Sequence, residues 1–231
     1  MRILLVASDP LEFSGMLSLA SDHGPVPLGI DWGRCARLGG HDALLIANGV
    51  GGKRAAAAVD ASSAFGPEAV VSTGFCGALD ESLDIADVVV ATTVDDGLKR
   101  FSALSVKGPF ETFAGPVRSI QRVVRTAEEK QLLRESGGAC AVEMEAGGVA
   151  ARALELELPF YCVRAVTDLA DESLVNDFNR ALRPDGHFDT MSILLGALRN
   201  PAICLPELLR LRTRSIQAAR ALGDFFADCR F

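Results

Sequence analysis

The chain is poor in the residues from which metal sites and covalent catalysts are commonly built. Only three of its 231 residues are histidines, and His23, His41 and His187 fall in loop-like segments without a spacing that suits a metal ion. No G-x-S-x-G turn is present, and the turn at Phe75 carries no hydroxyl group. We therefore expect no metal, no cofactor and no covalent nucleophile.

An excess of positive charge and long apolar runs are also missing. The formal net charge is −7, which argues against a general nucleic-acid binder, because phosphate backbones are held mainly by clustered lysine and arginine. A small neutral or cationic ligand fits better. No apolar stretch approaches the roughly 18 residues of a membrane span. Ser8 and Asp9 end the N-terminal run Met1–Ala7 too early for a signal peptide, so that run predicts a buried strand.

Paired cysteines are absent as well, because the six cysteines form no C-x-x-C motif. Several lie in apolar runs, where a reduced thiol behaves as a small hydrophobic side chain. This pattern favours a reducing, cytoplasmic location. The cysteines are Cys35, Cys76, Cys140, Cys162, Cys204 and Cys229.

The chain does contain short β-rich apolar runs that alternate with segments of helical period. Such alternation predicts an α/β fold in which helices cover both faces of a sheet, and 231 residues suffice for one domain, 1–231. The segment 95–119 carries mixed signals and predicts loops and edge strands. Strands are expected at 3–7, 43–47, 69–73, 88–92, 139–142 and 160–166, and helices at 52–65, 145–157, 189–199 and 205–228.

The last predicted helix is both basic and amphipathic. Leu208, Leu211, Leu222, Phe225 and Phe226 recur mostly at i+3 and i+4 spacings, with arginines between them. A helix of this kind can lie on a membrane surface. The alternative, which we prefer, is a helix packed on the body of the protein with its arginines in water.

Two glycine clusters follow predicted strands. The first, Asn48–Gly52, leads into a helix, but Arg54 replaces the third glycine of a dinucleotide fingerprint, so this signal is weak. The second is Thr73–Gly77. Glycines let a ligand approach the backbone, and they also serve tight turns, so both interpretations stay open.

Acidic side chains lie just beyond three predicted strands: Glu12, Glu145 and Asp168. Each has a structural explanation, because acids stabilise helix N-termini, and Asp9, Pro10 and Glu12 match a capping box. However, the ends of neighbouring strands can meet at one edge of a sheet. We therefore expect the three carboxylates to share one pocket, and such a pocket suggests chemistry.

Three segments together resemble the purine nucleoside and uridine phosphorylase family: Ser72–Leu79, Ala141–Ala146 and Val163–Asp168. The resemblance runs in order from Met1 to about Asp171, and its most specific part is the V-E-M-E-A string at 142–146. The branch that cleaves 5'-methylthioadenosine and S-adenosylhomocysteine is the most similar. The resemblance implies a three-layer αβα fold with a mixed twisted sheet, and cleavage of the N-glycosidic bond of a purine nucleoside.

The resemblance also implies roles for individual residues. Glu145 would hold the ribose hydroxyls, with Met144 against the sugar and Glu143 in support. Asp168 would hydrogen-bond the purine and protonate its N7 atom, and burial among other acids would keep it protonated. Glu12 would activate water. Gly74, Phe75 and Phe160 are further substrate-binding candidates.

Two departures from the family pattern bear on the reaction. The serine and arginine that hold phosphate in the phosphorylases are missing around Phe75, which favours hydrolysis unless Arg37, Lys53 or Arg54 substitutes. The segment 121–128 and the C-terminal helices resemble a divergent branch that includes phosphorylases linked to hopanoid lipids.

Three functions therefore remain open: hydrolysis of an adenine nucleoside, phosphorolysis of a related nucleoside that could be lipid-linked, and nucleoside binding without turnover. The resemblance further implies a homodimer or larger homo-oligomer.

Overall fold

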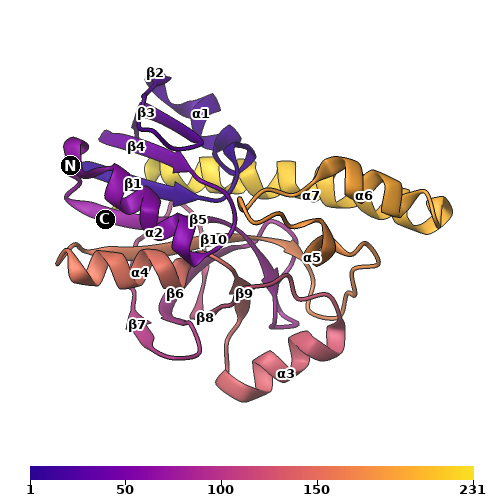
Figure 1. Cartoon of the computed structure of the whole chain (residues 1–231). Helices are drawn as coiled ribbons and strands as arrows, with labels where there is room; N and C mark the ends of the chain where they lie inside the picture. The colour runs from indigo at the N-terminus through magenta and orange to yellow at the C-terminus, as the bar shows by residue number, and fades with distance from the viewer.

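A computed structural model describes all residues, 1–231, and contains one mixed sheet of ten strands between helices (Figure 1). The strands are β1 (Arg2–Ala7), β2 (Ser21–Pro25), β3 (Trp32–Leu38), β4 (His41–Ala47), β5 (Ala69–Ala78), β6 (Val88–Asp95), β7 (Arg100–Ser102), β8 (Phe113–Ser119), β9 (Ala141–Glu143) and β10 (Phe160–Asp168). The α-helices are α1 (Ser14–Leu19), α2 (Gly52–Ala61), α3 (Ala127–Gly137), α4 (Ala146–Glu155), α5 (Phe178–Ala181), α6 (Thr190–Ala197) and α7 (Pro201–Asp228), and two 3₁₀ helices are η1 (Pro10–Phe13) and η2 (Ser63–Phe65).

The strand order explains how distant segments reach one site. β5 pairs in parallel with β1 through its first half and with β10 along most of its length, so the carboxyl ends of these three strands share one edge. β9 pairs with the last residues of β5, and β10 also pairs with β6. Because β8 joins β6 to β9, the strands β5, β10, β6, β8 and β9 close into a ring.

Alternate side chains of the strands pack on opposite faces of the sheet. On β1, Leu4 and Val6 belong to the apolar cluster that includes α2 and α4, whereas Ile3 and Leu5 belong to the cluster that includes α1 and α7. This alternation is what a sheet covered on both sides requires. The predicted three-layer αβα fold with a mixed sheet is confirmed.

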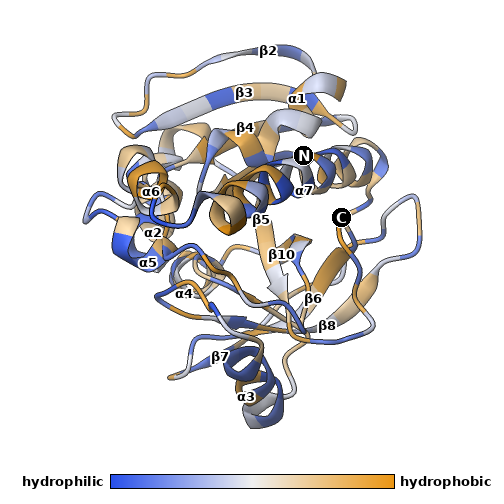
Figure 2. Cartoon of the chain, turned by 90° about the vertical axis from the view of Figure 1, so that its right-hand side faces the viewer, coloured by the Kyte–Doolittle hydropathy of each residue, from blue (hydrophilic) through white to orange (hydrophobic).

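All six predicted strands are present, with boundaries that differ by a few residues. The interpretation of 95–119 as loops and edge strands is wrong for β8, which is hydrogen-bonded to a neighbour on each side. The helix α3 was not predicted, because it is polar along nearly its whole surface and lacks an apolar stripe (Figure 2). It lies at the foot of the molecule in both views (Figures 1 and 2).

The long C-terminal helix packs on the body of the protein, as we preferred from the sequence. Leu222, Phe225 and Phe226 are buried against the sheet and α1. Leu208 and Leu211 line a cavity instead, and Arg210 and Arg220 are exposed. The C-terminal part of the apolar face is therefore covered within the chain, whereas Ile203, Leu205 and Leu209 near the start of α7 remain exposed. No helix combines the length and the apolar character needed to span a bilayer.

Candidate functional site

One cavity of about 400 Å³ gathers most of the candidate residues. Parts of the chain that are far apart in sequence form its wall: the segment after β1, the C-terminal half of β5, the β9–α4 junction, the end of β10, and α7. Six candidates line it, namely Glu12, Phe75, Glu143, Met144, Glu145 and Asp168. The three acids that follow separate strands thus share one pocket.

The carboxylate of Glu12 is surrounded by hydrogen-bond donors. The 3₁₀ helix η1 begins with Asp9 as its N-cap and Pro10 in its first turn, and the capping box is complete. One oxygen of Glu12, Oε2, accepts from Ser8 N and Oγ at 2.8 Å and from Asp9 N at 2.9 Å, while Oε1 accepts from Phe75 N at 2.7 Å. Burial raises the pKa of Glu12, and the positive charge of Arg164 and these donors oppose that rise.

Glu143 and Glu145 share a buried arginine. Arg164, on β10, donates to Glu143, to Ser72 Oγ at 2.6 Å and to Thr73 O at 2.9 Å, and its Nη1 lies 3.5 Å from Glu145 Oε2. Glu143 also accepts from the backbone N–H groups of Glu145 and Ala146, at the start of α4. Burial, followed by the negative charge of Glu143, raises the pKa of Glu145 to about 8.

Asp168 is held by a different cation. Its Oδ2 lies 2.6 Å from Nζ of Lys130, a residue of α3 whose side chain is buried, and its Oδ1 lies 3.1 Å from Thr167 Oγ1. We expected Asp168 to lie among other acids and to share a proton with them. The structure differs, because α3 brings an ammonium group to the carboxylate from a segment for which no helix was predicted.

Two glycines in the C-terminal half of β5 make room for the two candidate catalytic acids. A Cβ atom at Gly74 would lie 2.3 Å from Glu12 Oε1, and a Cβ atom at Gly77 would lie 2.8 Å from Asp168 Oδ2. Gly74 also has φ of +128°, which side-chain-bearing residues rarely adopt. The glycine cluster Thr73–Gly77 does not form the tight turn that the sequence left open, because β5 continues through it to Ala78. Each carboxylate occupies the space that a side chain at Gly74 or Gly77 would fill.

The remaining candidates divide into two groups. Met144 and Phe75 line the cavity, and Gly74 adjoins it through Glu12. The structure does not bring Phe160 to the cavity. Phe160 begins β10, pairs with Val70 and packs in the core with α2 and α4, at the opposite end of the strand from Asp168.

The bases that could have substituted for the missing phosphate ligands lie outside the cavity lining. Arg37 pairs with Asp42 on the exposed surface, and Arg54 pairs with Asp31 at 2.7 Å. Lys53 is exposed on α2. The arginines that do line the cavity are Arg122 and Arg212.

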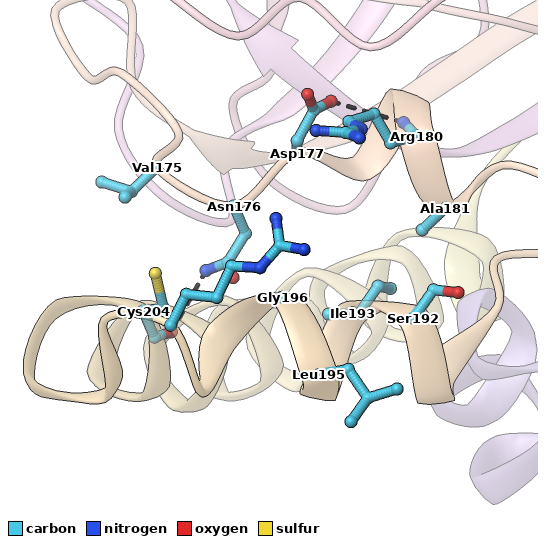
Figure 3. A pocket seen from close by; sticks show the side chains of 11 residues that line it. Val175, Asn176, Asp177, Arg180, Ala181, Ser192, Ile193, Leu195, Gly196 and Cys204 are labelled. Carbon is cyan, nitrogen blue, oxygen red and sulfur yellow. Dashed lines mark hydrogen bonds between the residues drawn. The ribbon is translucent and has the colours of Figure 1, made fainter.

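A second cavity, of about 430 Å³, lies between α5, α6 and α7 (Figure 3). Asn176 lines this cavity, and its side-chain amide donates to Cys204 O at 3.1 Å. Arg180 and Arg199 line this cavity together with Asp177, but none of the predicted site residues does. It therefore lacks the three acids Glu12, Glu145 and Asp168, on which the candidate chemistry depends.

The model of the phosphorylase superfamily matches residues 32–105 and 98–186, which together span more than half of the chain. The chain belongs to the phosphorylase superfamily. This finding confirms the family that the strings around Glu145 and Asp168 indicated.

Individual superfamily members show how far the similarity extends. The 5'-methylthioadenosine/S-adenosylhomocysteine nucleosidase of Staphylococcus aureus is 29% identical over 139 residues, which cover 46% of this chain and 59% of that protein. The chain therefore matches less than two thirds of the length of this relative.

Solved structures share the fold over nearly the whole chain. The same nucleosidase from Neisseria meningitidis, in complex with methylthio-immucillin-A, has a TM-score of 0.70 at 20% identity and covers 96% of this chain and 97% of its own. Futalosine hydrolase of Helicobacter pylori has a TM-score of 0.69 at 18% identity, with 97% of this chain and 96% of its own covered. At these identities the likeness establishes the fold.

Two residues of the site escaped the sequence analysis, Arg164 and Lys130. Arg164 had a usable signal, because an arginine within the apolar strand 160–166 must find a buried partner. Lys130 had none, since it lies in a polar segment next to other charged residues.

Proposed function

We propose that this superfamily member hydrolyses the N-glycosidic bond of an adenine nucleoside such as 5'-methylthioadenosine or S-adenosylhomocysteine. The observation that carries the proposal is the meeting of Glu12, Glu145 and Asp168 in one cavity. The names of the relatives, nucleosidases acting on these two compounds and a futalosine hydrolase, support the same bond as the target.

The three acids have separate tasks in this reaction. Cleavage passes through a sugar with cationic character and requires a leaving base that departs more easily when protonated. Asp168 would give the proton to N7 of the base, Glu145 would hold the ribose hydroxyls, and Glu12 would accept a proton from the attacking water. A carboxylate beside the developing positive charge binds the transition state more strongly than the ground state.

Water suits this cavity better than phosphate as the nucleophile. A phosphate dianion needs several charge-assisted donors, but Arg37, Lys53 and Arg54 lie elsewhere, and Arg164 is already paired with Glu143 and Glu145. The carboxylates of Glu12 and Glu143 would repel a dianion near the sugar. A water molecule carries no charge and needs only the acceptor that Glu12 provides.

A phosphorylase acting on an adenosine with an apolar or lipid-linked 5' group is the second candidate. It is favoured by the apolar wall that α5, α7 and the segment before α6 add to the cavity through Phe178, Phe188, Leu208 and Leu211. Arg212 lies on the same wall and could contribute to phosphate binding. This candidate requires that product formation depend on phosphate.

Binding without turnover is the third possibility and the one least supported. A binding module would need Glu145 for the ribose and one group for the base, but it would not need Glu12 buried in a cage of donors. Tight nucleoside binding without release of adenine would favour it.

We further propose that the protein forms a homodimer or larger homo-oligomer. Several large apolar side chains that are exposed on α6, just after it and on α7 support this proposal. They include Met191, Leu195, Leu198 and Leu209. Exposed apolar area of this kind marks interaction surfaces. Sedimentation of the wild type beside a Leu195→Glu, Leu198→Glu variant tests this, and flotation with lipid vesicles tests the membrane alternative.

Hydrolysis and phosphorolysis are distinguished by whether phosphate is incorporated into the sugar product. The protein is incubated with methylthioadenosine, S-adenosylhomocysteine and adenosine in buffer with and without phosphate, and the sugar product is identified by ¹H NMR for a free sugar and by ³¹P NMR for a sugar 1-phosphate. A free sugar in both buffers supports hydrolysis. A sugar 1-phosphate that appears only with phosphate establishes the second candidate instead.

A further inference from the structure

The helix α3 buries a lysine and exposes a leucine. Lys130 is the only buried residue of α3, whereas Leu132, two positions later, is 64% exposed. Removal of an ammonium group from water is costly unless the group is paired and hydrogen-bonded. On the same face of the helix Leu133 packs against a small apolar cluster, so Lys130 takes a position next to apolar contacts that calls for a specific partner.

That partner is the carboxylate to which we assign protonation of the base. Nζ of Lys130 lies 2.6 Å from Asp168 Oδ2 and also donates to the backbone carbonyl of Leu169. With Oδ2 held in this way and Gly77 leaving space beside it, Oδ1 is the oxygen left to meet a ligand. Thr167 Oγ1 is within hydrogen-bond distance of both Oδ1 and Cys76 O, and its single proton can serve either acceptor.

Other charged groups near Asp168 are accounted for by their own partners or stand further off. On α7, Arg214 pairs with Glu172, and the charge of Asp168 contributes to raising the pKa of Arg214. On β5, the buried Cys76 has its pKa raised, first by burial. Arg122 and Arg212 line the cavity, and Arg122 pairs with Glu129 at 3.0 Å. The contact from α3 is the one direct ion pair of Asp168.

We propose that Lys130 is a positioning residue that orients Asp168 and stabilises the negative charge left on it when the base leaves. In this step the Oδ1–H bond of Asp168 breaks and an N7–H bond forms, while the C1'–N9 bond breaks and its electron pair passes to the base. Asp168 ends as a carboxylate paired with the ammonium group of Lys130. The inference rests on the proposed function, in which Asp168 is the acid.

The ion pair between Lys130 and Asp168 should affect the pH dependence of the activity, and this makes the proposal testable. A cation beside a carboxyl group favours the ionised form of that group. A carboxyl group without such a cation keeps its proton to higher pH, but it gives up that proton less readily. The limb of the pH profile on which activity falls as Asp168 loses its proton should therefore move to higher pH.

The test compares Lys130→Met and Lys130→Arg with the wild type, and Lys53→Met, an exposed lysine of α2, is the matched control. In Lys130→Met we expect kcat on the acidic plateau to fall about tenfold and the alkaline limb of kcat/KM to move to higher pH. Lys130→Arg should restore the position of the limb, and Lys53→Met should match the wild type. A lower plateau with an unmoved limb would mean a structural role and would overturn the proposal.

A second readout needs no turnover. The carboxyl group of Asp168 is titrated by ¹³C NMR in the wild type and in Lys130→Met, with Asp168→Asn used to assign its signal. The proposal expects the titration midpoint to be higher in Lys130→Met, and equal midpoints would contradict it. If no nucleoside is cleaved, the proposed function fails while this titration still reports on the pair, so the two failures are distinguishable.

Discussion

The two ends of the cavity differ in the partners of their acidic side chains. At the end to which we assign the sugar, Glu12 is surrounded mainly by neutral N–H and O–H donors, and Glu143 and Glu145 share the single charge of Arg164. At the end to which we assign the purine, Asp168 has its own ammonium partner, Lys130. Acidic side chains outnumber basic ones at the first end, which would suit a sugar that becomes cationic, whereas the second end has one of each.

Under the proposed function, this difference would let one small cavity favour both charge separation and proton transfer. Excess negative charge attracts the developing cation at the sugar, and a balanced pair lets one acid change its charge without leaving it uncompensated. The following predictions test that contrast, and they run from the largest expected effect to the smallest.

Loss of either candidate catalytic acid should have the largest effect. Asp168→Asn removes the proton donor and Glu12→Gln removes the acceptor for water, and each should lower kcat by about 10²–10⁴-fold, the usual contribution of general acid–base catalysis. The rate of adenine release measures both. Full activity in either variant would remove that residue from the mechanism.

Substitutions at Gly77 and Gly74 of β5 should affect activity and stability to different extents. In Gly77→Ala the new Cβ would displace the carboxylate of Asp168, which is the end of a side chain and can shift without disturbing the backbone. We expect kcat/KM to fall about 10²-fold, as for other small misplacements of reacting groups, with a fall in Tm that is smaller than the one caused by Gly74→Ala.

Gly74→Ala differs because the backbone itself is constrained. Its φ of +128° adds strain of about 1–3 kcal/mol to the displacement of Glu12, so both activity and Tm should fall. Gly137→Ala, in α3 with open space around it, is the control and should keep its activity. Equal melting temperatures for the Gly74 and Gly77 variants would contradict this distinction.

Ser8→Ala should change the pH profile more than the maximal rate. The hydroxyl of Ser8 donates to Glu12 and lowers its pKa, which burial has raised. Removal of the hydroxyl should raise the pKa of Glu12 further, so the limb on which activity falls with acid should move to higher pH. We expect a loss of about tenfold in kcat/KM near neutral pH, since one hydrogen bond to a charged group contributes about 1.5–3 kcal/mol. An unmoved acidic limb would exclude Glu12 as its origin.

The smallest expected effect is a pH dependence of stability at the sugar end. Glu145 has its pKa raised from 4.5 to about 8 in the folded chain, so between these values the folded state keeps a proton that the unfolded state has lost. Stability from this group is therefore present at low pH and declines as the pH rises through that window. Glu145→Gln should flatten the decline in Tm by a few degrees, roughly what 1 kcal/mol produces in a chain of this size. An equal slope in both proteins would contradict the assignment.

The sequence was sufficient to predict those site residues that directly follow a strand. Glu12, Glu145 and Asp168 could be grouped because each follows a strand, and strand ends meet at one edge of a sheet. The alternation of apolar runs was enough to predict the layers. The capping box at Asp9 and Glu12 was also visible in the sequence, and the structure gives the same glutamate a contact with Phe75 N from the neighbouring strand.

What the sequence could not supply were contacts that depend on tertiary packing. Nothing in 127–137 indicates that Lys130, rather than Leu132, turns inward, because its partner Asp168 is 38 positions away in sequence. Phe160 was placed in the site although it begins its strand, and side chains at the start of β10 lie far from those at its end. The closure of the ring through β8 was also missed, because that strand carries Gly115 and Pro116 in its middle.

The most direct test of the central claim is the release of adenine from methylthioadenosine without phosphate, by the wild type and by Asp168→Asn. The account predicts steady release by the wild type, unchanged when phosphate is added, and a loss of about 10²–10⁴-fold in the variant. Release that requires phosphate, or equal release by both proteins, would contradict it.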